Sequence, residues 1–267
     1  MTDSIGFLGL GNLGRPIVTN LMDCGYRVSI YNRDARKVDS FVARGATRAS
    51  RPADAVPLGG VVVSLLWDDA SVESVVRSED FLTRLGQGGV HVSMTTLSPS
   101  GSRSLMALHA KHGSTMVEAP IFGRPEAAAA KKLWIVTAGQ TAAKERVRAI
   151  LEGAGAQGIF DFGEEAGAAL TVKLIGNMLI ISAVASMTEG LALARNMNVD
   201  SQSVVDMLTT TLFPAPIYKS YGSLIAQGKQ SVGDGLIAAK DVGLFKATAE
   251  ALGSPAAVSG FILSLGK

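Results

Sequence analysis

The sequence is almost without cysteine and poor in histidine. Cys24 is the one cysteine among 267 residues, so the chain forms no internal disulfide and no metal site of several thiolates. We expect Cys24, on the first helix, to be a small buried apolar residue. Of the three histidines, His109 and His112 lie three apart in an expected helix without a carboxylate or third ligand placed beside them. We therefore expect a solvated helix face there and no metal.

A strong charge of one sign is also absent. The formal net charge is +2, and Lys and Arg form no stripe interleaved with aromatic residues, so no nucleic-acid partner is expected. No Ser-His-Asp order or nucleophile-elbow motif indicates a hydrolase. The chain enters an expected strand at once, without a signal peptide, and its most apolar segment, residues 174–187, is too short to span a bilayer. These absences predict a cytoplasmic protein without a membrane partner.

Glycine, by contrast, is plentiful, and three glycines near the N-terminus form the pattern GxGxxG. Gly9, Gly11 and Gly14 follow a strand-like apolar run and precede a helix-like segment. Such glycines permit a tight turn and let backbone N–H groups approach a pyrophosphate at the positive end of the next helix. The pattern therefore predicts a dinucleotide-binding turn that also includes Asn12 and Leu13.

The end of the next apolar run predicts which dinucleotide binds. Units that bind NAD usually carry Asp or Glu there, about 20 residues after the glycines. This chain has Asn32 and Arg33, with Arg36 and Lys37 one turn further on. A carboxylate would repel a 2′-phosphate, whereas Arg offers it a fork of donors. We expect NADP(H) in preference, with Asn32, Arg33 and Lys37 near the ribose, while NAD(H) stays possible if these cations form only a solvated patch.

Strand and helix signals alternate through the first 160 residues or so, which indicates an α/β fold with a parallel, doubly wound sheet. After the opening unit, further strands are expected at residues 60–66, 90–94, 114–118, 133–138 and 158–161, and helices at 98–112 and 141–152. Strand signals then cease. We therefore predict a Rossmann domain over residues 1–163 and a helical substrate and dimerisation domain over residues 164–267.

A long helix is expected over residues 164–197, apolar on every side. Such a helix must be buried all round, and we expect a partner subunit to help bury it. Lys173 and Asn177 lie four apart on one face of it, with Gly176 between them. An ammonium in apolar surroundings is paired, exposed in a cleft or used in chemistry, for example to protonate a carbonyl oxygen as hydride arrives. From this segment alone, a lysine that reaches the surface is an equal alternative.

Five segments, taken in order, resemble the β-hydroxyacid dehydrogenase family, which includes 3-hydroxyisobutyrate dehydrogenases and the reductases of tartronate semialdehyde, glyoxylate and succinic semialdehyde. The segments lie along nearly the whole chain: FLGLGNLGRPIVTNL (7–21), SMTTLSP (93–99), EAPIFGRPEAAAAKKLWIVTAG (118–139), GAALTVKLIGNM (167–178) and AAKDVGL (238–244). The resemblance implies a Rossmann domain joined by a long helix to an all-helical domain that forms a homodimer or homotetramer.

The resemblance also implies roles for individual residues. Lys173 would be the acid in reduction and the base in oxidation. Asn177 would hydrogen-bond the substrate or orient the lysine. Thr95, in place of the family's serine, would touch the nicotinamide or the substrate carboxylate, and Lys240 would close over the cofactor.

The substrate loop departs from the family pattern at two positions. Phe122 and Arg124 flank Gly123 where the family usually has Ser and Gly, residues that bind the substrate carboxylate. Arg124 could bind a carboxylate bidentately. Equally, Arg124 could point to solvent, with Phe122 narrowing the pocket for a small or less polar substrate.

Three functions follow. The first is an NADP-dependent oxidoreductase that reduces a small aldehyde or keto acid and, in reverse, oxidises a hydroxy acid, with Lys173 as general acid and base. The second is an imine reductase-like enzyme on the same scaffold. The third is a non-catalytic NADPH-binding dimeric module. The presence of Lys173 argues against the second, and the presence of both Lys173 and Asn177 argues against the third.

Overall fold

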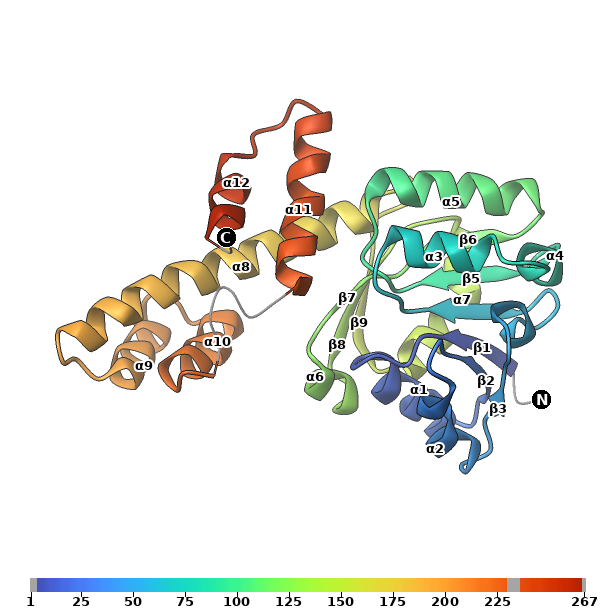
Figure 1. Cartoon of the computed structure of the whole chain (residues 1–267), viewed down its shortest axis with the longest axis horizontal. Coiled ribbons are helices and arrows are strands. Elements are labelled where there is room, and N and C mark those ends of the chain that lie inside the picture. Colours follow the sequence, from blue (N-terminus) through green and yellow to red (C-terminus); the bar gives the residue numbers. More distant parts are fainter. Residues whose placement is uncertain (1–3, 230–235, 266–267) are drawn as a thin grey trace. The chain divides into compact units, whose positions relative to one another are not determined.

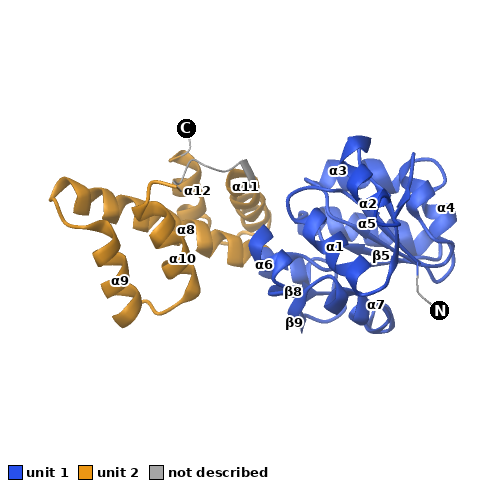
Figure 2. Cartoon of the chain, turned by 90° about the horizontal axis from the view of Figure 1, so that it is seen from below, with its two compact units in different colours: residues 1–173 blue, residues 174–267 orange. Residues whose placement is uncertain are grey.

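The chain folds into two compact units, residues 1–173 and 174–267 (Figure 2). A computed structural model describes residues 4–229 and 236–265. The domain boundary expected from the sequence, between residues 163 and 164, precedes the long helix α8 (Ala168–Asn196), whereas the two units divide within it. The first turns of α8 therefore belong to the first unit.

A six-stranded parallel sheet forms the centre of the first unit (Figure 1). Its strands, in the spatial order β3-β2-β1-β4-β5-β6, are β3 (Thr47–Arg48), β2 (Arg27–Tyr31), β1 (Ser4–Leu8), β4 (Val61–Ser64), β5 (Val90–Ser93) and β6 (Thr115–Glu118). This is the dinucleotide-binding strand order, in which ligands bind at the carboxyl ends of the strands where the order reverses, here at β1 and β4. The predicted Rossmann fold is confirmed.

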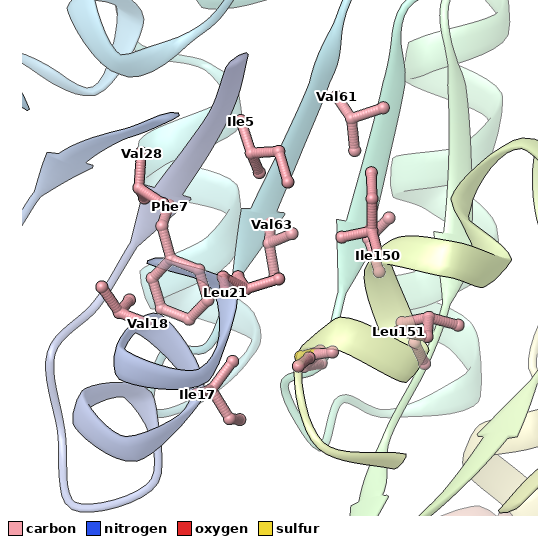
Figure 3. Packing of buried hydrophobic residues seen from close by; sticks show 14 of the residues in the cluster. Ile5, Phe7, Ile17, Val18, Leu21, Val28, Val61, Val63, Ile150 and Leu151 are labelled. Atoms are coloured by element: carbon pink, nitrogen blue, oxygen red, sulfur yellow. The ribbon is translucent and has the colours of Figure 1, made fainter. Parts of the chain in front are cut away.

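Helices cover both faces of this sheet. One face packs on α1 (Gly14–Asp23) and α7 (Thr141–Gly153), in the cluster of Figure 3, which includes Phe7, Leu21 and Ile150. The other face packs on α3 (Asp69–Val76), α4 (Phe81–Leu85) and α5 (Pro99–Lys111). Short helical turns add to both layers: Ala35–Val38 and α2 (Asp39–Val42) pack with α1 and α7, and Pro52–Ala55 packs with α3, α4 and α5. Strands buried on both faces read as apolar runs, which is why the sequence predicted them.

A second, three-stranded sheet follows β6. Its strands are β7 (Ile121–Phe122), β8 (Leu133–Thr137) and β9 (Ala156–Asp161), and α6 (Pro125–Ala129) lies in the connection after β7. β7 pairs antiparallel with β8, and β8 pairs parallel with β9. The sequence analysis did not predict β7 or its antiparallel pairing. β7 and α6 are too short to leave a periodic signal in the sequence.

The described residues of the second unit form helices, as expected: the remainder of α8, then α9 (Ser201–Thr211), α10 (Pro216–Ala226), α11 (Leu236–Ala251) and α12 (Ala257–Ser264). α8 begins four residues later than predicted, at Ala168. It is not buried all round within one chain, because Leu179 and Leu193 are 61% and 65% exposed. The helix has 29 residues, and an 18-residue stretch of it has a mean hydropathy of 1.8, so by length and composition alone it could cross a membrane. The argument that the apolar segment is too short was therefore wrong.

Two expectations about single side chains are also wrong. Cys24 caps the C-terminus of α1 and is exposed. His109 is wholly buried, because its face of α5 packs on the sheet, where His91 lies opposite.

A chain of hydrogen bonds links the two buried histidines. His91 Nε2 lies 2.8 Å from Ser64 Oγ, His91 Nδ1 lies 3.0 Å from His109 Nε2, and His109 Nδ1 lies 3.0 Å from Ser114 Oγ. The Ser114 hydroxyl donates to the His109 carbonyl, so His109 Nδ1–H donates to Ser114. We assign both rings, by this logic, as neutral Nδ1–H tautomers.

Candidate functional site

The glycine turn lies at the carboxyl end of β1, at the point where the strand order reverses. A Cβ on Gly9 would stand 2.3 Å from the Leu65 carbonyl oxygen, and one on Gly14 would stand 2.1 Å from the Gly9 carbonyl oxygen. A Cβ on Gly11 would meet no atom within 4 Å. Gly9 and Gly14 are therefore required for packing, whereas Gly11 leaves exposed backbone that a pyrophosphate can approach. The residues present fit a dinucleotide.

Asn32 connects the end of β2 to this turn. Its Oδ1 accepts the Leu10 N–H at 2.8 Å, and its Nδ2 donates to the Asp34 carbonyl oxygen at 2.8 Å. Arg33 and Lys37 are exposed beside it. Arg36 pairs with Asp34 at 3.0 Å and, through that hydrogen bond, lowers the pKa of the Asp34 carboxyl group. Four sequence-predicted cofactor residues (Gly9, Gly11, Asn32 and Arg33) thus follow the carboxyl ends of the neighbouring parallel strands β1 and β2.

Thr95 follows β5 and is almost wholly buried. Its Oγ1 accepts the Leu66 N–H at 2.8 Å, so the loops after β4 and β5 are held together. The residue before Leu66 supplies the carbonyl oxygen that packs on Gly9. Thr95 is therefore connected, through one loop, to the dinucleotide turn.

Lys173 lies in the second turn of α8 with a side chain that is nine-tenths buried. Its Nζ stands 4.3 Å from the centroid of the Phe122 ring, a cation–π distance. Phe122, Val136 and the first turns of α8 form one apolar cluster. The structure thus brings together two residues that the sequence analysis had singled out separately, and Lys173 does not extend along the surface as the alternative supposed.

Arg124 differs from Phe122 in its surroundings. It precedes α6, its side chain is 48% exposed, and its Nε lies 3.6 Å from Glu126. Gly123 has φ +150°, and a Cβ there would lie 2.5 Å from a methyl group of Leu133, so the loop requires glycine at this position.

Asn177 and Lys240 share a carboxylate in the second unit. Asp241 accepts from Asn177 Nδ2 at 2.5 Å and pairs with Lys240 Nζ at 2.7 Å. Asp241 is 2% exposed, and the sequence analysis did not select it. The available signal was an acidic residue beside Lys240 inside an apolar helix, since a buried carboxylate needs partners.

Glu118, at the end of β6, is a second residue that the sequence analysis missed. Its buried side chain accepts hydrogen bonds from Ser102 Oγ and from the N–H groups of Gly167, Ala169 and Leu170. Burial raises the pKa of the Glu118 carboxyl group, and these hydrogen bonds partly offset that rise. Its partner helix is α8, which carries Lys173.

Within residues 4–229 and 236–265, no group of three or more His, Cys, Asp or Glu side chains could hold a metal ion.

Comparisons with known proteins agree with this geometry. The family model for the NAD binding domain of 6-phosphogluconate dehydrogenase matches residues 4–170, and the model for the NAD-binding domain of NADP-dependent 3-hydroxyisobutyrate dehydrogenase matches residues 167–265. An uncharacterised oxidoreductase of Bacillus subtilis, YfjR, is 36% identical over 226 residues, which cover 84% of this chain and 78% of that protein.

Two further relatives extend the comparison. The 3-hydroxyisobutyrate dehydrogenase of Pseudomonas aeruginosa is 29% identical over 94% of this chain and 87% of its own length. The imine reductase of Streptomyces aurantiacus has the same fold, with a TM-score of 0.74 at 22% identity, over 98% of this chain and 92% of that one. The strand order, the glycine turn and these matches together show that the chain is an NAD(P)-dependent oxidoreductase of the β-hydroxyacid dehydrogenase family.

Proposed function

We propose that this enzyme reduces the carbonyl group of a small aldehyde or keto acid with NADPH and, in reverse, oxidises the corresponding hydroxy acid. Bound NADPH would supply the hydride. Lys173 donates the proton to the carbonyl oxygen in reduction and withdraws it from the hydroxyl group in oxidation. The observation that carries this proposal is the position of the Lys173 ammonium group, nine-tenths buried beside the Phe122 ring, because buried titratable groups gather at functional sites.

The preference for NADPH is supported by the charges at the end of β2. The Asn32 side chain already makes hydrogen bonds to the backbone of Leu10 and Asp34, and the Asp34 carboxylate forms an ion pair with Arg36. In the described part of the chain Arg33 forms no ion pair. Its exposed guanidinium fits a 2′-phosphate, and Lys37 adds a second positive charge.

Asn177 contacts the substrate or orients Lys173 from the next turn of α8, and Lys240 contacts the cofactor. Asp241 supports this proposal because it holds both side chains at once, which limits their freedom before any ligand binds. Thr95 contacts the nicotinamide or the substrate with its hydroxyl group, held in place by the Leu66 N–H.

The substrate group nearest Lys173 is small or weakly polar. Arg124 is half-exposed and paired with Glu126, whereas Phe122 presents its ring to the lysine. This arrangement supports the alternative in which Phe122 narrows the pocket, over the one in which Arg124 binds a carboxylate.

The enzyme works in the cytoplasm as a homodimer or homotetramer built through the helical unit. Leu179 and Leu193 of α8 are more than half exposed within one chain, and a second copy would cover them. The first turn of α8 packs on Val136 of β8, which supports a helix docked on protein over one inserted in a membrane.

Reduction of a cyclic imine is the second candidate function, favoured by the superposition on an imine reductase and by the aromatic surface beside Lys173. A screen of NADPH oxidation with glyoxylate, succinic semialdehyde, tartronate semialdehyde and a cyclic imine separates the two. We expect an aldehyde to be turned over and Lys173→Ala to abolish its turnover. Turnover of the imine alone would replace the proposal, and NADPH binding without any oxidation would indicate a non-catalytic module.

A further inference from the structure

We infer that Glu118 is a positioning residue for Lys173: its buried carboxylate holds the first turn of α8 and thereby fixes the place of the ammonium group one turn later. This inference rests on the proposed function, in which Lys173 handles the proton. Glu118 itself lies at the end of β6, and Ala169 in the first turn of α8 follows it 51 residues later in the sequence.

The contacts of Glu118 are those of a helix cap supplied from a distance. Oε1 accepts the Gly167 N–H at 2.6 Å together with the Ser102 hydroxyl group. Oε2 accepts the N–H groups of Ala169 at 3.1 Å and Leu170 at 3.4 Å. The first N–H groups of any helix lack partners within the helix. Residue 167 is glycine and has no side chain to cap them, so Glu118 does.

The ionised form of Glu118 suits these contacts, because three backbone N–H groups and a hydroxyl group all donate to it. Charge-assisted hydrogen bonds of this kind are stronger than neutral ones. The positive end of the α8 dipole adds to the attraction. One carboxylate therefore fixes both the position and the axial register of the start of α8.

Glu118 also fixes the strand that carries Phe122. Its backbone N–H donates to the Ala138 carbonyl at 2.9 Å, and its carbonyl accepts from Ala138 at 3.2 Å, which joins the two sheets. The chain continues from there through residues 119 and 120 into β7, where Phe122 meets Lys173 at 4.3 Å. The side chains of Lys173 and Phe122 face each other, and both are thus anchored to Glu118, the first through α8 and the second through the strand that leads into β7.

Only a short piece of helix separates the residues that Glu118 contacts from Lys173. Lys173 follows Leu170 by three residues, which is roughly 4.5 Å along a helix axis, and this part of α8 is packed against Val136. A misplacement of a catalytic group by about 1 Å can cost about a hundredfold in rate. The Glu118 charge also offsets the positive end of the helix, so its loss disfavours the ammonium form of Lys173.

The test compares Glu118→Gln, Glu118→Asp and the control Glu164→Gln in the full-length enzyme. Glutamine keeps the shape of Glu118, but its NH2 group cannot accept from a backbone N–H. Aspartate keeps the charge on a shorter stem. Glu164 is an exposed acid near the start of α8 that accepts from Thr141 at 2.7 Å instead, so the same substitution there leaves the α8 cap intact.

We expect Glu118→Gln to lower kcat about tenfold with the KM for NADPH within about twofold. The loss of reductase activity at high pH should move to lower pH, and hydrogen exchange at residues 168–173 should accelerate. Glu118→Asp should restore the position of the pH profile with a reduced kcat. Glu164→Gln should resemble the parent in all four measurements.

A lower melting temperature for Glu118→Gln with unchanged kcat and pH profile would overturn the inference, because a merely stabilising residue behaves in that way. Lys173→Ala is assayed in parallel. If Lys173→Ala leaves turnover intact, the proposed function falls and the role of Glu118 falls with it. If Lys173→Ala abolishes turnover while Glu118→Gln does not slow it, only the role of Glu118 is refuted.

Discussion

Acid should destabilise this enzyme through the buried pair of His91 and His109, and His109→Gln is the substitution that isolates the effect. Both rings are 0% exposed. Burial, with a smaller contribution from the charge of His112, lowers the pKa of His109 from 6.5 to about 4. Burial and the neighbouring His109 likewise lower the pKa of His91 well below its ordinary value.

The direction of this pH effect on stability follows from which state of the chain, folded or unfolded, binds the proton more readily. The unfolded chain binds a proton at each histidine near pH 6.5, whereas folded His109 stays neutral until about pH 4. The stability tied to this residue is therefore complete above pH 6.5 and is lost as the pH falls towards 4. A difference of about 2.5 pH units corresponds to about 3.5 kcal/mol in the free energy of unfolding once the pH is well below 4, at roughly 1.4 kcal/mol per unit.

The assay is urea unfolding of the parent and of His109→Gln at a series of pH values from about 7 to about 4, extrapolated to water. We expect the free energy of unfolding of the parent to fall by up to about 3 kcal/mol more than that of the variant over this pH range. Glu118, whose raised pKa acts in the opposite direction, is present in both proteins and cancels. His112→Gln, at the exposed C-cap of α5, is the matched control. Parallel loss of stability in the parent and His109→Gln would refute the reasoning.

Three further predictions concern ligand binding. Gly11→Ala should keep the parent's melting temperature but weaken NADPH binding in a fluorescence titration. Gly14→Ala should lower the melting temperature, because a Cβ on Gly14 would stand 2.1 Å from a backbone oxygen, whereas one on Gly11 would meet no atom. Equal melting temperatures of the two variants would contradict this. Arg33→Ala should weaken NADPH about tenfold and NADH hardly at all, as expected for a hydrogen bond to a charged group, and equal losses would exclude the phosphate contact. Phe122→Ser should improve kcat/KM for glyoxylate relative to a neutral aldehyde, and an unchanged ratio would show that the ring does not select the substrate.

The features that the sequence predicted correctly are those that leave a pattern among neighbouring residues. The order of apolar runs and glycines was enough for the Rossmann sheet, since strands buried on both faces are apolar throughout. Gly9, Gly11 and Gly14 could be placed because a dinucleotide turn has a fixed spacing. Lys173 stood out because a charge in an apolar helix is costly.

What failed depends on contacts between distant segments. The solvated face expected for His109 ignored His91, which lies on β5, 18 residues earlier. The exposure of Leu179 and Leu193 within one chain leaves the predicted burial of α8 by a partner subunit as a prediction. The contact of Phe122 with Lys173 joins segments about 50 residues apart, and periodicity along the chain carries no signal for such pairs.

The most direct test of the central claim is a single-turnover measurement on Lys173→Met, a variant that keeps a long side chain without the charge. The enzyme is loaded with NADPH, mixed rapidly with the aldehyde that the parent turns over best, and followed by loss of NADPH absorbance. We predict hydride transfer slower by about 10²- to 10⁴-fold, the usual contribution of a general acid, with an NADPH dissociation constant within about twofold of the parent. A rate within a few-fold of the parent would contradict the assignment of Lys173 as the proton donor.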